Sequence, residues 1–505
     1  MHPEWAHGLG KRMRGRLSAI TIILLITGTA ISTEESARLV LSVEDLPTSL
    51  ERGDEFAGGA VSDVIHTLGL VYIETSNLQA SLSIAFEDED VHYVELSVED
   101  DPTESSYPDD PLYATTQYGP QLINADEVWE FAKGDGPKSL CVLGSGIRTT
   151  HEEFGGSRWL GGYDFRRGDS TPDDEIGHES LATSIATANT NNLKGIAGVS
   201  PNTTYYTPKF QGTGSFDSDA ASTNAFQSCR DNNTAVYSYS YGSLGTYSHS
   251  RATLIQQIWE NDSLVVSSTG NGGSQAPCDD DECVIFPGNL TSVVAVGNVN
   301  ALKQLVADSS TGNETELVAP GFQIVGAGFT LDFGYQTDSG TSFAVPHVAG
   351  AAALIWNIEP ALPASVLRDI LDETAEDLGA TGRDKLFGFG LIDAKAAADT
   401  IYPKSLPICR FLSPTRFNEY AATAPTISGN VTFKTWTNST GSTISSVKLL
   451  VDSTEYNMLT TSDPHVYELT FDTTGISNAV HTIKTKCVES DAGFREHSRS
   501  YTVSN

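Results

Sequence analysis

A serine at the start of a helix of small residues is the feature of this sequence that most directly predicts chemistry. Ser342 follows Gly340 and Thr341 and opens the run Phe343–Gly350, in which alanine and glycine are mixed with larger apolar residues. That composition predicts a helix that packs closely against its neighbours. Unpaired backbone N–H groups and the positive end of the helix dipole lie at its start and favour negative charge on a nearby oxygen. Ser342 is therefore a candidate nucleophile for acyl transfer.

The same segment, Gly340–Gly350, closely resembles the serine segment of the subtilisin family of serine proteases. The resemblance implies that Ser342 attacks peptide carbonyls. A second segment, Ser267–Gly273, follows the apolar strand Leu264–Val266 and is similar to the family's oxyanion-hole segment. It implies that the amide of Asn271 hydrogen-bonds the oxygen of the tetrahedral intermediate. Taken alone, the Asn-Gly pair predicts only a turn.

A general base is implied by the segment Gly177–Ser184, which partly matches the family's histidine segment, His-Gly-Thr-His-Val-Ala-Gly. The match assigns the base to His178, whereas Glu179 and Leu181 replace a glycine and a second histidine. The following residues, 188–201, resemble the loop after the catalytic histidine helix in thermitase-like members.

The third catalytic group of the family, an aspartate, is missing. The apolar strand Leu140–Leu143 runs into Gly144-Ser145-Gly146, where the family has Asp-Thr/Ser-Gly, so Gly144 stands at the aspartate position. Glycine has no acceptor that could hold the tautomer of His178 or stabilise its cation. Loss of that group costs roughly 10⁴-fold in kcat.

No other carboxylate is expected to replace this aspartate. Glu179 is adjacent to His178 on the predicted helix, and neighbouring positions of a helix do not face each other. Asp338 is expected on the serine side of the cleft, and Asp164 matches a position that is aspartate in intact relatives as well. The sequence thus predicts a subtilase site with impaired catalysis, in which Gly144→Asp restores the missing group.

The substrate cleft is expected between two strands, by resemblance to the family. These strands would pair with an extended peptide as added β-strands. Tyr241 replaces a smaller apolar residue and is expected to narrow or reshape the cleft. The expected substrate-binding residues are Ser240, Tyr241, Gly242, Ser268, Thr269 and Gly270.

A calcium site is also implied by resemblance to thermitase-like members. Calcium takes about six to eight oxygens, many from backbone carbonyls, and a loop that contains glycine and asparagine can supply them. Glu153 replaces an aspartate of the family's site. The expected ligands are the side chains of Asp110, Glu153 and Asn192 and the carbonyls of Asn189, Lys194 and Ile196.

The N-terminus predicts export. Basic residues precede the apolar run Leu17–Ala30, a pattern typical of a secretory signal peptide cleaved after Ala30. A membrane anchor is the alternative, although the run is short for a span of about 20 residues. The formal net charge of −35 over 505 residues disfavours nucleic acid and anionic membranes as partners. We expect a monomer that is secreted or associated with the cell surface.

The six cysteines of an exported chain are expected to be paired. Two of them can close a short loop, two should pair across the C-terminal region, and two remain on a strand and a helix. The sequence alone does not fix the connectivity. The pairs considered are Cys278 with Cys283, Cys409 with Cys487, and Cys141 with Cys229.

The first half of the predicted domain order consists of a signal peptide, 1–30, and a small domain, 31–106. Strands are predicted over 37–41, 70–75 and 91–96, and helices over 59–68 and 78–86. This order resembles the subtilase propeptide, a ferredoxin-like α+β domain, and implies that it assists folding and inhibits the protease.

The second half consists of residues 107–403 and 404–505. In the former, apolar strands alternate with helical patterns, which predicts a three-layer α/β domain with a parallel sheet and helices on both faces. The latter is rich in Thr, Ser and Val in short alternating runs, which predicts a small antiparallel β-sandwich that resembles bacterial Ig-like domains.

The sequence therefore predicts a secreted subtilisin-like serine endopeptidase that hydrolyses peptide bonds and is impaired at Gly144. Two alternatives stay open. One is a non-catalytic pseudoprotease that binds extended peptides in the cleft, and the other is an adhesion protein that works through its C-terminal sandwich. The retained Ser342, His178 and Asn271 favour residual activity, whereas the changes at Gly144 and Glu179 favour binding alone.

Overall fold

The computed structural model describes two compact units of the chain, Met1–Ser105 and Ser106–Asn505. The predicted signal peptide, 1–30, lies outside the described residues. These are 37–43, 54–56, 59–65, 70–75, 81, 91–96, 108–213, 218–242, 247–273, 283–402, 407–414, 424–439, 443–490 and 494–505.

The described part of the first unit is an antiparallel sheet in the order β2-β3-β4-β1-β5. The helix predicted over 59–68 is wrong, because residues 59–65 form a strand paired with β4. β-Branched Val61, Val64 and Ile65 favour the extended chain, and Val61 is buried. The helix predicted over 78–86 lies outside the described residues apart from position 81, so the ferredoxin-like fold stays a prediction. The strands are β1 Ala37–Val43, β2 Glu55–Phe56, β3 Gly59–Ile65, β4 Leu70–Thr75 and β5 Val91–Leu96.

The second unit is built around a six-stranded sheet in the order β11-β10-β9-β8-β6-β7. Every neighbouring pair is parallel, which confirms the predicted parallel sheet. All its strand residues are buried, as expected where helices cover both faces. The strands are β6 Leu140–Leu143, β7 Tyr205–Tyr206, β8 Val236–Tyr239, β9 Leu264–Ser268, β10 Val293–Val299 and β11 Thr315–Pro320.

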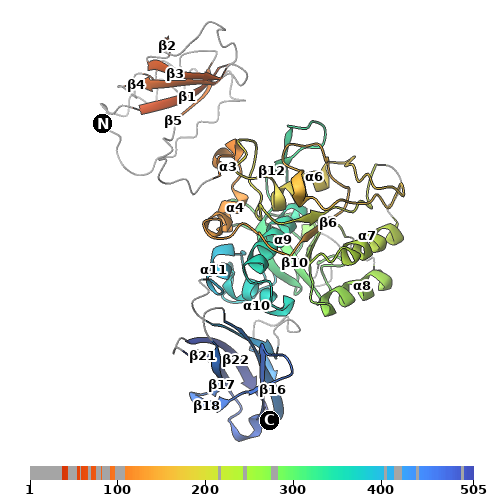
Figure 1. Ribbon diagram of the computed structural model, residues 1–505, viewed down its shortest axis with the longest axis vertical. Helices are drawn as coiled ribbons and strands as arrows, with labels where there is room; N and C mark the ends of the chain where they lie inside the picture. The colour runs from red at the N-terminus through yellow and green to blue at the C-terminus, as the bar shows by residue number, and fades with distance from the viewer. Residues whose placement is uncertain are drawn as a thin grey trace. The chain divides into compact units, whose positions relative to one another are not determined.

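Alternating side chains of the strands contact different helices, which gives the predicted three layers. Leu140 and Val142 join the core cluster that contains α6 (His178–Thr187) and α9 (Thr341–Ile358). Cys141 and Leu143 instead face α7 and α8, which lie side by side in Figure 1. The disulfide Cys141–Cys229 joins β6 to α7 on this face. The other helices and strands of this domain are α3 Pro111–Thr115, α4 Gly119–Leu122, α5 Ala125–Val128, η1 Gly156–Arg158, α7 Asp219–Asp231, α8 His249–Glu260, β12 Ile324–Ala327, β13 Tyr335–Asp338, α10 Ala364–Thr374 and α11 Ala394–Asp399.

Helix α9 is the central element of the domain, and all its residues are buried. Its small residues permit close packing, since a Cβ on Gly350 would lie 2.9 Å from Cβ of Val199. Among the described residues it is the one helix long and apolar enough to cross a membrane, but its complete burial identifies it as a core helix. The first turn of this rigid helix carries Ser342.

The C-terminal residues form two sheets that pack face to face, as predicted, in the orders β14-β16-β20-β19 and β15-β22-β21-β17-β18. The disulfide Cys409–Cys487 links β14 to β21 across the sheets, which confirms that pairing. The sandwich is not wholly antiparallel, because β15 pairs in parallel with β22. The Ig-like resemblance stays a prediction, and Cys278 lies outside the described residues. The elements are β14 Ile408–Ser413, β15 Thr426–Ile427, β16 Asn430–Asn438, β17 Ile444–Val451, β18 Thr454–Asn457, β19 Leu459–Thr460, β20 Val466–Asp472, η4 Thr473–Gly475, β21 Val480–Glu489 and β22 Phe494–Val503.

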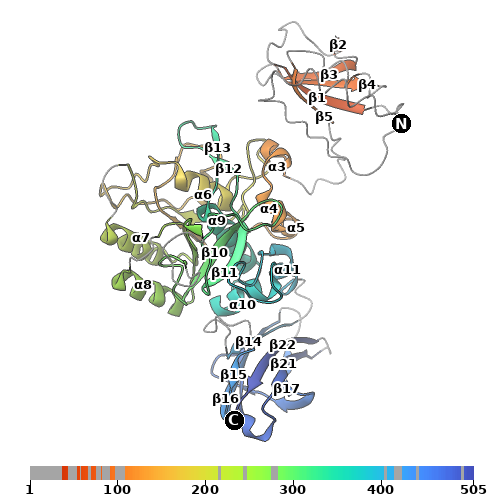
Figure 2. The same ribbon diagram turned by 180° about the vertical axis from the view of Figure 1, so that it is seen from behind.

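The sandwich packs directly against α10 of the α/β domain (Figure 2). A buried ionic cluster lies at this contact. Glu373 of α10 accepts a hydrogen bond from Arg410 at 2.9 Å and one from Arg499 at 3.2 Å, and it lies 2.7 Å from His497. We refer to Glu373, Arg410, His497 and Arg499 as the interdomain cluster.

Candidate active site

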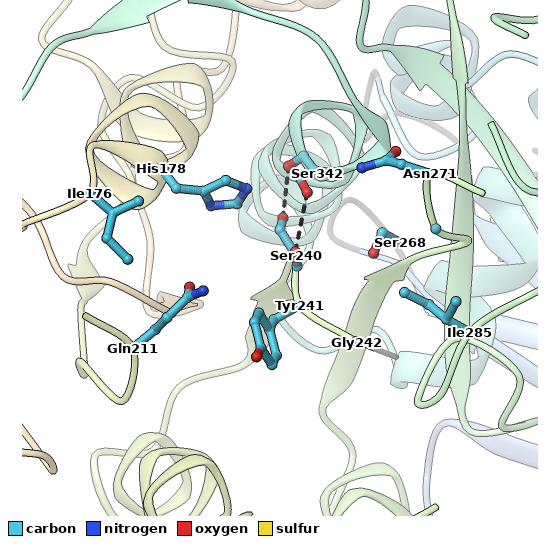
Figure 3. Close-up of a pocket in the computed structure, with 11 residues that line it drawn as sticks. Ile176, His178, Gln211, Ser240, Tyr241, Gly242, Ser268, Asn271, Ile285 and Ser342 are labelled. Atoms are coloured by element: carbon cyan, nitrogen blue, oxygen red, sulfur yellow. Dashed lines mark hydrogen bonds between the residues drawn. The ribbon is translucent and has the colours of Figure 1, made fainter. Parts of the chain in front are cut away.

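Ser342 is the second residue of α9 and is 9% exposed. Its Oγ donates to the carbonyl oxygen of Ser240 at 3.2 Å, and Oγ of Ser240 donates to the carbonyl of Ser342 at 2.7 Å (Figure 3). These two bonds tie the start of α9 to the end of β8. They fix Ser342 at the carboxyl edge of the parallel sheet, where active sites of such sheets lie.

Asn271 follows β9 at the same edge. Its Oδ1 accepts hydrogen bonds from the backbone N–H of Thr341 at 2.9 Å and from its hydroxyl at 2.8 Å. These two hydrogen bonds fix the orientation of the Asn271 amide, and its Nδ2 points toward Ser342 in Figure 3. A donor in this place can stabilise an oxyanion that forms beside Ser342 Oγ.

His178 projects from the first residue of α6 toward Ser342. Its Nδ1 lies 2.7 Å from Oε1 of Glu179. The expectation that the side chains of His178 and Glu179 do not face each other is therefore wrong. Residues that are adjacent in sequence normally point in different directions from a helix. Here both residues lie in the first turn of α6, and the long side chain of Glu179 reaches the ring of His178.

The Glu179 carboxylate occupies the space that a side chain at position 144 would take. A Cβ built on Gly144 would lie 1.9 Å from the carboxyl carbon of Glu179, so a side chain at position 144 and the present position of this carboxylate exclude each other. The backbone N–H of Ser145 donates to Oε2 of Glu179 at 2.6 Å. A side chain introduced by Gly144→Asp would collide with this carboxylate unless Glu179 moved, so the predicted effect of that substitution depends on Glu179 as well.

A second carboxylate, Asp174, holds these parts together. Its Oδ1 accepts from Oγ of Ser145 at 2.7 Å and from the N–H of Gly177 at 2.8 Å. Its Oδ2 accepts from the N–H and the hydroxyl of Ser180 at 3.0 and 2.7 Å. Asp174 thus connects the end of β6 to the start of α6, the two segments that meet at Glu179.

The surroundings set the charge of the pair formed by His178 and Glu179. Burial lowers the pKa of His178, but the charge of Glu179 and its hydrogen bond outweigh burial and raise that pKa above its ordinary value. Burial likewise raises the pKa of Glu179, yet His178 and the hydrogen bonds from Ser145 bring it below its ordinary value. Glu179 is 1% exposed. The pair therefore favours a carboxylate beside an imidazolium, the charge distribution that general-base catalysis creates.

A cavity of about 310 Å³ opens in front of Ser342. Of the predicted substrate residues, Thr269 does not line it: its side chain is fully buried, and its N–H donates to Val296 in the sheet at 3.0 Å. Its neighbours Ser268 and Gly270 line the cavity instead. The lining residues are Ile176, His178, Gln211, Ser240, Tyr241, Gly242, Ser268, Gly270, Asn271, Ile285 and Ser342.

Sequence reasoning missed Glu179, Asp174 and the lining residues Ile176, Gln211 and Ile285. For Glu179 a signal was present in the sequence. The family's aspartate is replaced by glycine at position 144, and the glycine that follows the base is replaced by glutamate at position 179. These three lining residues come from loops without a periodic pattern, so no comparable signal was present for them in the sequence.

The predicted calcium residues come together at the loop after α6. Oδ2 of Asp110 accepts from the N–H of Asn191 at 2.9 Å, and Oε1 of Glu153 accepts from the N–H of Ile196 at 3.0 Å. The Asn192 side chain accepts from the N–H of Lys194 at 2.8 Å.

This donor set fits a calcium ion. Oε2 of Glu153 is buried and makes no hydrogen bond, and burial raises the pKa of Glu153 to about 8. Burial also raises the pKa of Asp110 to about 6. Two buried carboxylates close enough to repel each other form an environment that a hard cation stabilises. No group of three or more His, Cys, Asp or Glu side chains suited to a metal occurs among the described residues.

Comparison with known proteins gives a consistent result. The sequence model of the Subtilase family, Peptidase_S8, matches residues 135–390. Thermitase of Thermoactinomyces vulgaris is 32% identical over 276 residues, which cover 54% of this chain and 94% of thermitase. The halolysin-like extracellular serine protease Nep of Natrialba magadii is 30% identical over 407 residues, 76% of this chain and 72% of Nep. Subtilisin DY of Bacillus licheniformis is 31% identical over 284 residues, 56% of this chain and 99% of that protein.

Proposed function

Because this chain belongs to the subtilase family of serine proteases, we propose that it is a working serine endopeptidase in which Glu179 replaces the missing aspartate. The observation that carries the proposal is the 2.7 Å contact between Nδ1 of His178 and Oε1 of Glu179. The activity is therefore expected to exceed that of a site without an orienting carboxylate.

The contact with Glu179 determines which nitrogen of His178 carries a proton. A carboxylate only accepts hydrogen bonds, so Nδ1 of His178 carries a proton and donates to Glu179. The other ring nitrogen, Nε2, is then unprotonated in the neutral ring and able to take a proton from Ser342. Glu179 also stabilises the imidazolium that results.

The remaining steps use Ser342 and Asn271, whose backbones the fold holds in place. Oγ of Ser342 must turn from the Ser240 carbonyl toward Nε2 of His178, as often happens when substrate enters an empty site. It then attacks the peptide carbonyl carbon, and the amide of Asn271 hydrogen-bonds the oxygen that becomes negative. His178 returns the proton to the leaving nitrogen, and water releases the acyl group by the same steps in reverse.

A reciprocal exchange of two residues tests the proposal. Glu179→Gly should reduce kcat/KM for a denatured protein substrate by roughly 10⁴-fold, because it removes the carboxylate. Gly144→Asp alone should also reduce activity, because its side chain overlaps Glu179. The double variant Gly144→Asp/Glu179→Gly places one carboxylate at the family position and should recover at least roughly 100-fold over Glu179→Gly.

Three results would contradict the proposal: a Glu179→Gly variant as active as wild type, a Gly144→Asp single variant more active than wild type, or no cleavage by any folded form. The last would favour the pseudoprotease that binds peptides in the cleft. Reaction of Ser342 with a fluorophosphonate separates these cases, because only an activated serine reacts rapidly, and Ser342→Ala is the control.

We place this activity outside the cell. A similar protein, Nep, is named as extracellular, and the disulfides Cys141–Cys229 and Cys409–Cys487 suit an oxidising compartment. The substrates are peptides or proteins, and the N-terminal unit is proposed to be the inhibitor of the same chain. Detection of the chain in culture medium, cleaved after Ala30, tests this part of the proposal.

We also propose that calcium binds between Asp110, Glu153 and the loop 189–196. Supporting this are the buried, unbonded Oε2 of Glu153 and the repulsion between the two carboxylates. A ligand that binds only the folded state raises the melting temperature by mass action. Millimolar calcium should raise the melting temperature of wild type, and Glu153→Gln should reduce this rise; equal melting curves in calcium and in chelator would remove the site.

A further inference from the structure

Three loops that enter the parallel sheet carry the same short sequence. Asn-x-Ser/Thr without proline at the middle position is the acceptor sequence for N-linked sugars. Residues 107–403 contain five such sequences, and two of them precede β10 and β11. The other three precede β7, β8 and β9, and we refer to their asparagines, Asn202, Asn232 and Asn261, as the edge asparagines.

The three loops lie at the amino edge of the sheet, where its strands begin. The N–H of Leu140, the first residue of β6, donates to the carbonyl of Thr204 at 2.9 Å. The N–H of Leu264, the first residue of β9, donates to the carbonyl of Ala235 at 2.9 Å. These hydrogen bonds connect the loops to one another, so the edge asparagines belong to one side of the domain.

The active-site cavity lies at the other edge. Neighbouring strands are parallel, so their amino ends share one edge and their carboxyl ends share the other. Strand β8 has four residues and β9 has five, so at about 3.3 Å per residue the two edges are roughly 13–17 Å apart. All three edge asparagines are described by the structure, and none of them lines the cavity. Sugars attached there would leave the approach to Ser342 open.

The folded chain has room for a sugar at each edge asparagine. All three are exposed, although the C-terminal sandwich packs against the same domain. Nδ2 of Asn232 donates to the carbonyl of Ser228 at 2.8 Å, and Nδ2 of Asn261 donates to that of Gln257 at 2.7 Å. A glycosylated amide keeps one of its two hydrogens, so these bonds can persist after the modification.

Helix ends and packing explain only part of these sequences. Two of the edge asparagines are the C-cap residues of α7 and α8, and asparagine occurs at helix ends without sugars as well. The hydroxyl of Thr234 donates to the carbonyl of Cys229 at 2.9 Å. Within the ranges that the structure describes, however, the hydroxyls of Thr204 and Ser263 make no hydrogen bond to another residue. A role in the acceptor sequence accounts for these two hydroxyls.

We propose that the amino edge of the sheet is a glycosylated face, in which Asn202, Asn232 and Asn261 each carry an N-linked oligosaccharide. The donor is an oligosaccharide linked to a lipid phosphate, and an oligosaccharyltransferase of the export route catalyses the transfer. A bond forms between Nδ2 and C1 of the first sugar, while the bond from C1 to the lipid phosphate breaks. The phosphate leaves with the electron pair of that bond, and the amide loses one proton. The modification requires export of the chain but no cleavage of peptide bonds.

The test is mass spectrometry of the full-length protein recovered from the culture medium of its source. Peptides that contain the edge asparagines should carry the added mass of sugar residues, and fragmentation should place that mass on the asparagine. Thr204→Ala should abolish the sugar at Asn202, whereas Thr204→Ser should retain it, because either hydroxyl completes the acceptor sequence. The control is Asn224, an exposed asparagine of α7 that is followed by Ala225 and Phe226 and should stay unmodified.

The outcomes separate this inference from the proposed function. Asn202 without a sugar in wild type, equal modification of Thr204→Ala and wild type, or a sugar on Asn224 would overturn the inference and leave the endopeptidase activity standing. A glycosylated protein that neither cleaves peptides nor reacts with a fluorophosphonate would overturn the endopeptidase activity alone. Should Thr204→Ala fail to fold, Ser263→Ala and Ser263→Thr provide the same comparison at Asn261.

Discussion

Two histidine–glutamate contacts of equal length lie in different parts of this protein. In the active site, Nδ1 of His178 lies 2.7 Å from Glu179, and at the interdomain cluster Nε2 of His497 lies 2.7 Å from Glu373. Their effects on the histidines are opposite. The pKa of His178 is raised above its ordinary value, whereas that of His497 is lowered.

The difference comes from the neighbours of each pair. Burial lowers the pKa of both rings, but around His178 the other nearby charges are the carboxylates of Asp174 and Asp338, which add to the effect of Glu179. Around His497 two guanidinium groups, Arg410 and Arg499, oppose the effect of Glu373.

Hydrogen bonding differs as well. At His497, Nδ1 accepts from the backbone N–H of Phe411 at 3.1 Å, so both ring nitrogens are engaged. At His178, Glu179 engages Nδ1, and the ring lines the cavity together with Ser342. A short contact with a carboxylate therefore does not make a histidine a base. A catalytic pair also needs a second nitrogen directed at the nucleophile and no competing cation.

The comparison predicts, as the largest effect, a loss of activity from Glu179→Gln. Glutamine keeps the shape but not the charge, so His178 loses the group that stabilises its cation, and kcat/KM should fall by roughly 10³- to 10⁴-fold. Peptide hydrolysis under saturating and limiting substrate measures the change. Glu373→Gln is the matched control and should stay within about 3-fold of wild type at a temperature where it is folded; a loss equal to that of Glu179→Gln would show that activity reports stability alone.

For stability we expect the larger effect at the interdomain cluster. Glu373→Gln leaves Arg410 and Arg499 with fewer counter-charges in a buried contact, so the free energy of unfolding should drop by about 3–5 kcal/mol. Urea titration at pH 7 measures it. Glu376→Gln, which breaks the exposed pair with Lys303, should cost less than about 1 kcal/mol.

The loss of unfolding free energy in Glu373→Gln should also depend on pH, and it should become smaller as the pH falls. Burial raises the pKa of Glu373, but His497 and the arginines outweigh burial and lower this pKa from its ordinary 4.5 to about 2. Its stabilising contribution is therefore complete above 4.5 and is lost as the pH falls toward 2. The difference between wild type and Glu373→Gln should shrink over that range; a constant difference would contradict the assignment of charge.

Asp174→Asn should have a smaller effect on catalysis. The substitution removes one carboxylate oxygen from the network that joins Ser145 to α6, and the position of Glu179 should loosen. We expect kcat to fall by roughly 10-fold with KM unchanged, equivalent to about 1.4 kcal/mol for one or two hydrogen bonds to a charged group. Asp169→Asn, on the same loop but bonded to Thr171, is the control. An equal effect of both variants would assign the loss to the loop as a whole.

The smallest expected change is in the pH profile. His178 must be neutral to act as a base, so kcat/KM rises with pH through its raised pKa. Glu179→Gln removes the main charge that raises this pKa, and the acidic limb should therefore move to lower pH in the residual activity. Glu373→Gln should leave the limb in place, and a limb that stays fixed in Glu179→Gln would show that the carboxylate does not act on the base.

The sequence was sufficient for the parts of this fold that long apolar patterns specify. The strand before Gly144 and the helix after Ser342 are predicted by their composition, and the parallel sheet follows from their alternation. The strand β3 was missed because Gly59-Ala60 and a short mixed-polarity run do not distinguish a helix from a strand, and pairing with β4 decided the outcome. Ile285 was missed for a related reason, since its place in the cavity beside Gly242 and Gly270 depends on contacts between segments that are distant in sequence.

Glu179 illustrates a different limit. Its neighbour relation to His178 was visible, and a rule about helix surfaces excluded it. The space above Gly144, which the Glu179 carboxylate fills, could not be read from the sequence, because it exists only once β6 and α6 are packed together. The replacement becomes convincing only when the space and the side chain that fills it are seen together.

The exchange between positions 144 and 179 also constrains how such genes can recombine. Consider a chimera that has Gly144 from this chain but, at position 179, the glycine of a relative. It would have no carboxylate to orient His178. The opposite chimera would have two in a space that holds one. We therefore expect crossovers that separate β6 from α6 to lose the proposed activity, so selection for that activity would keep these two segments together despite their distance along the chain.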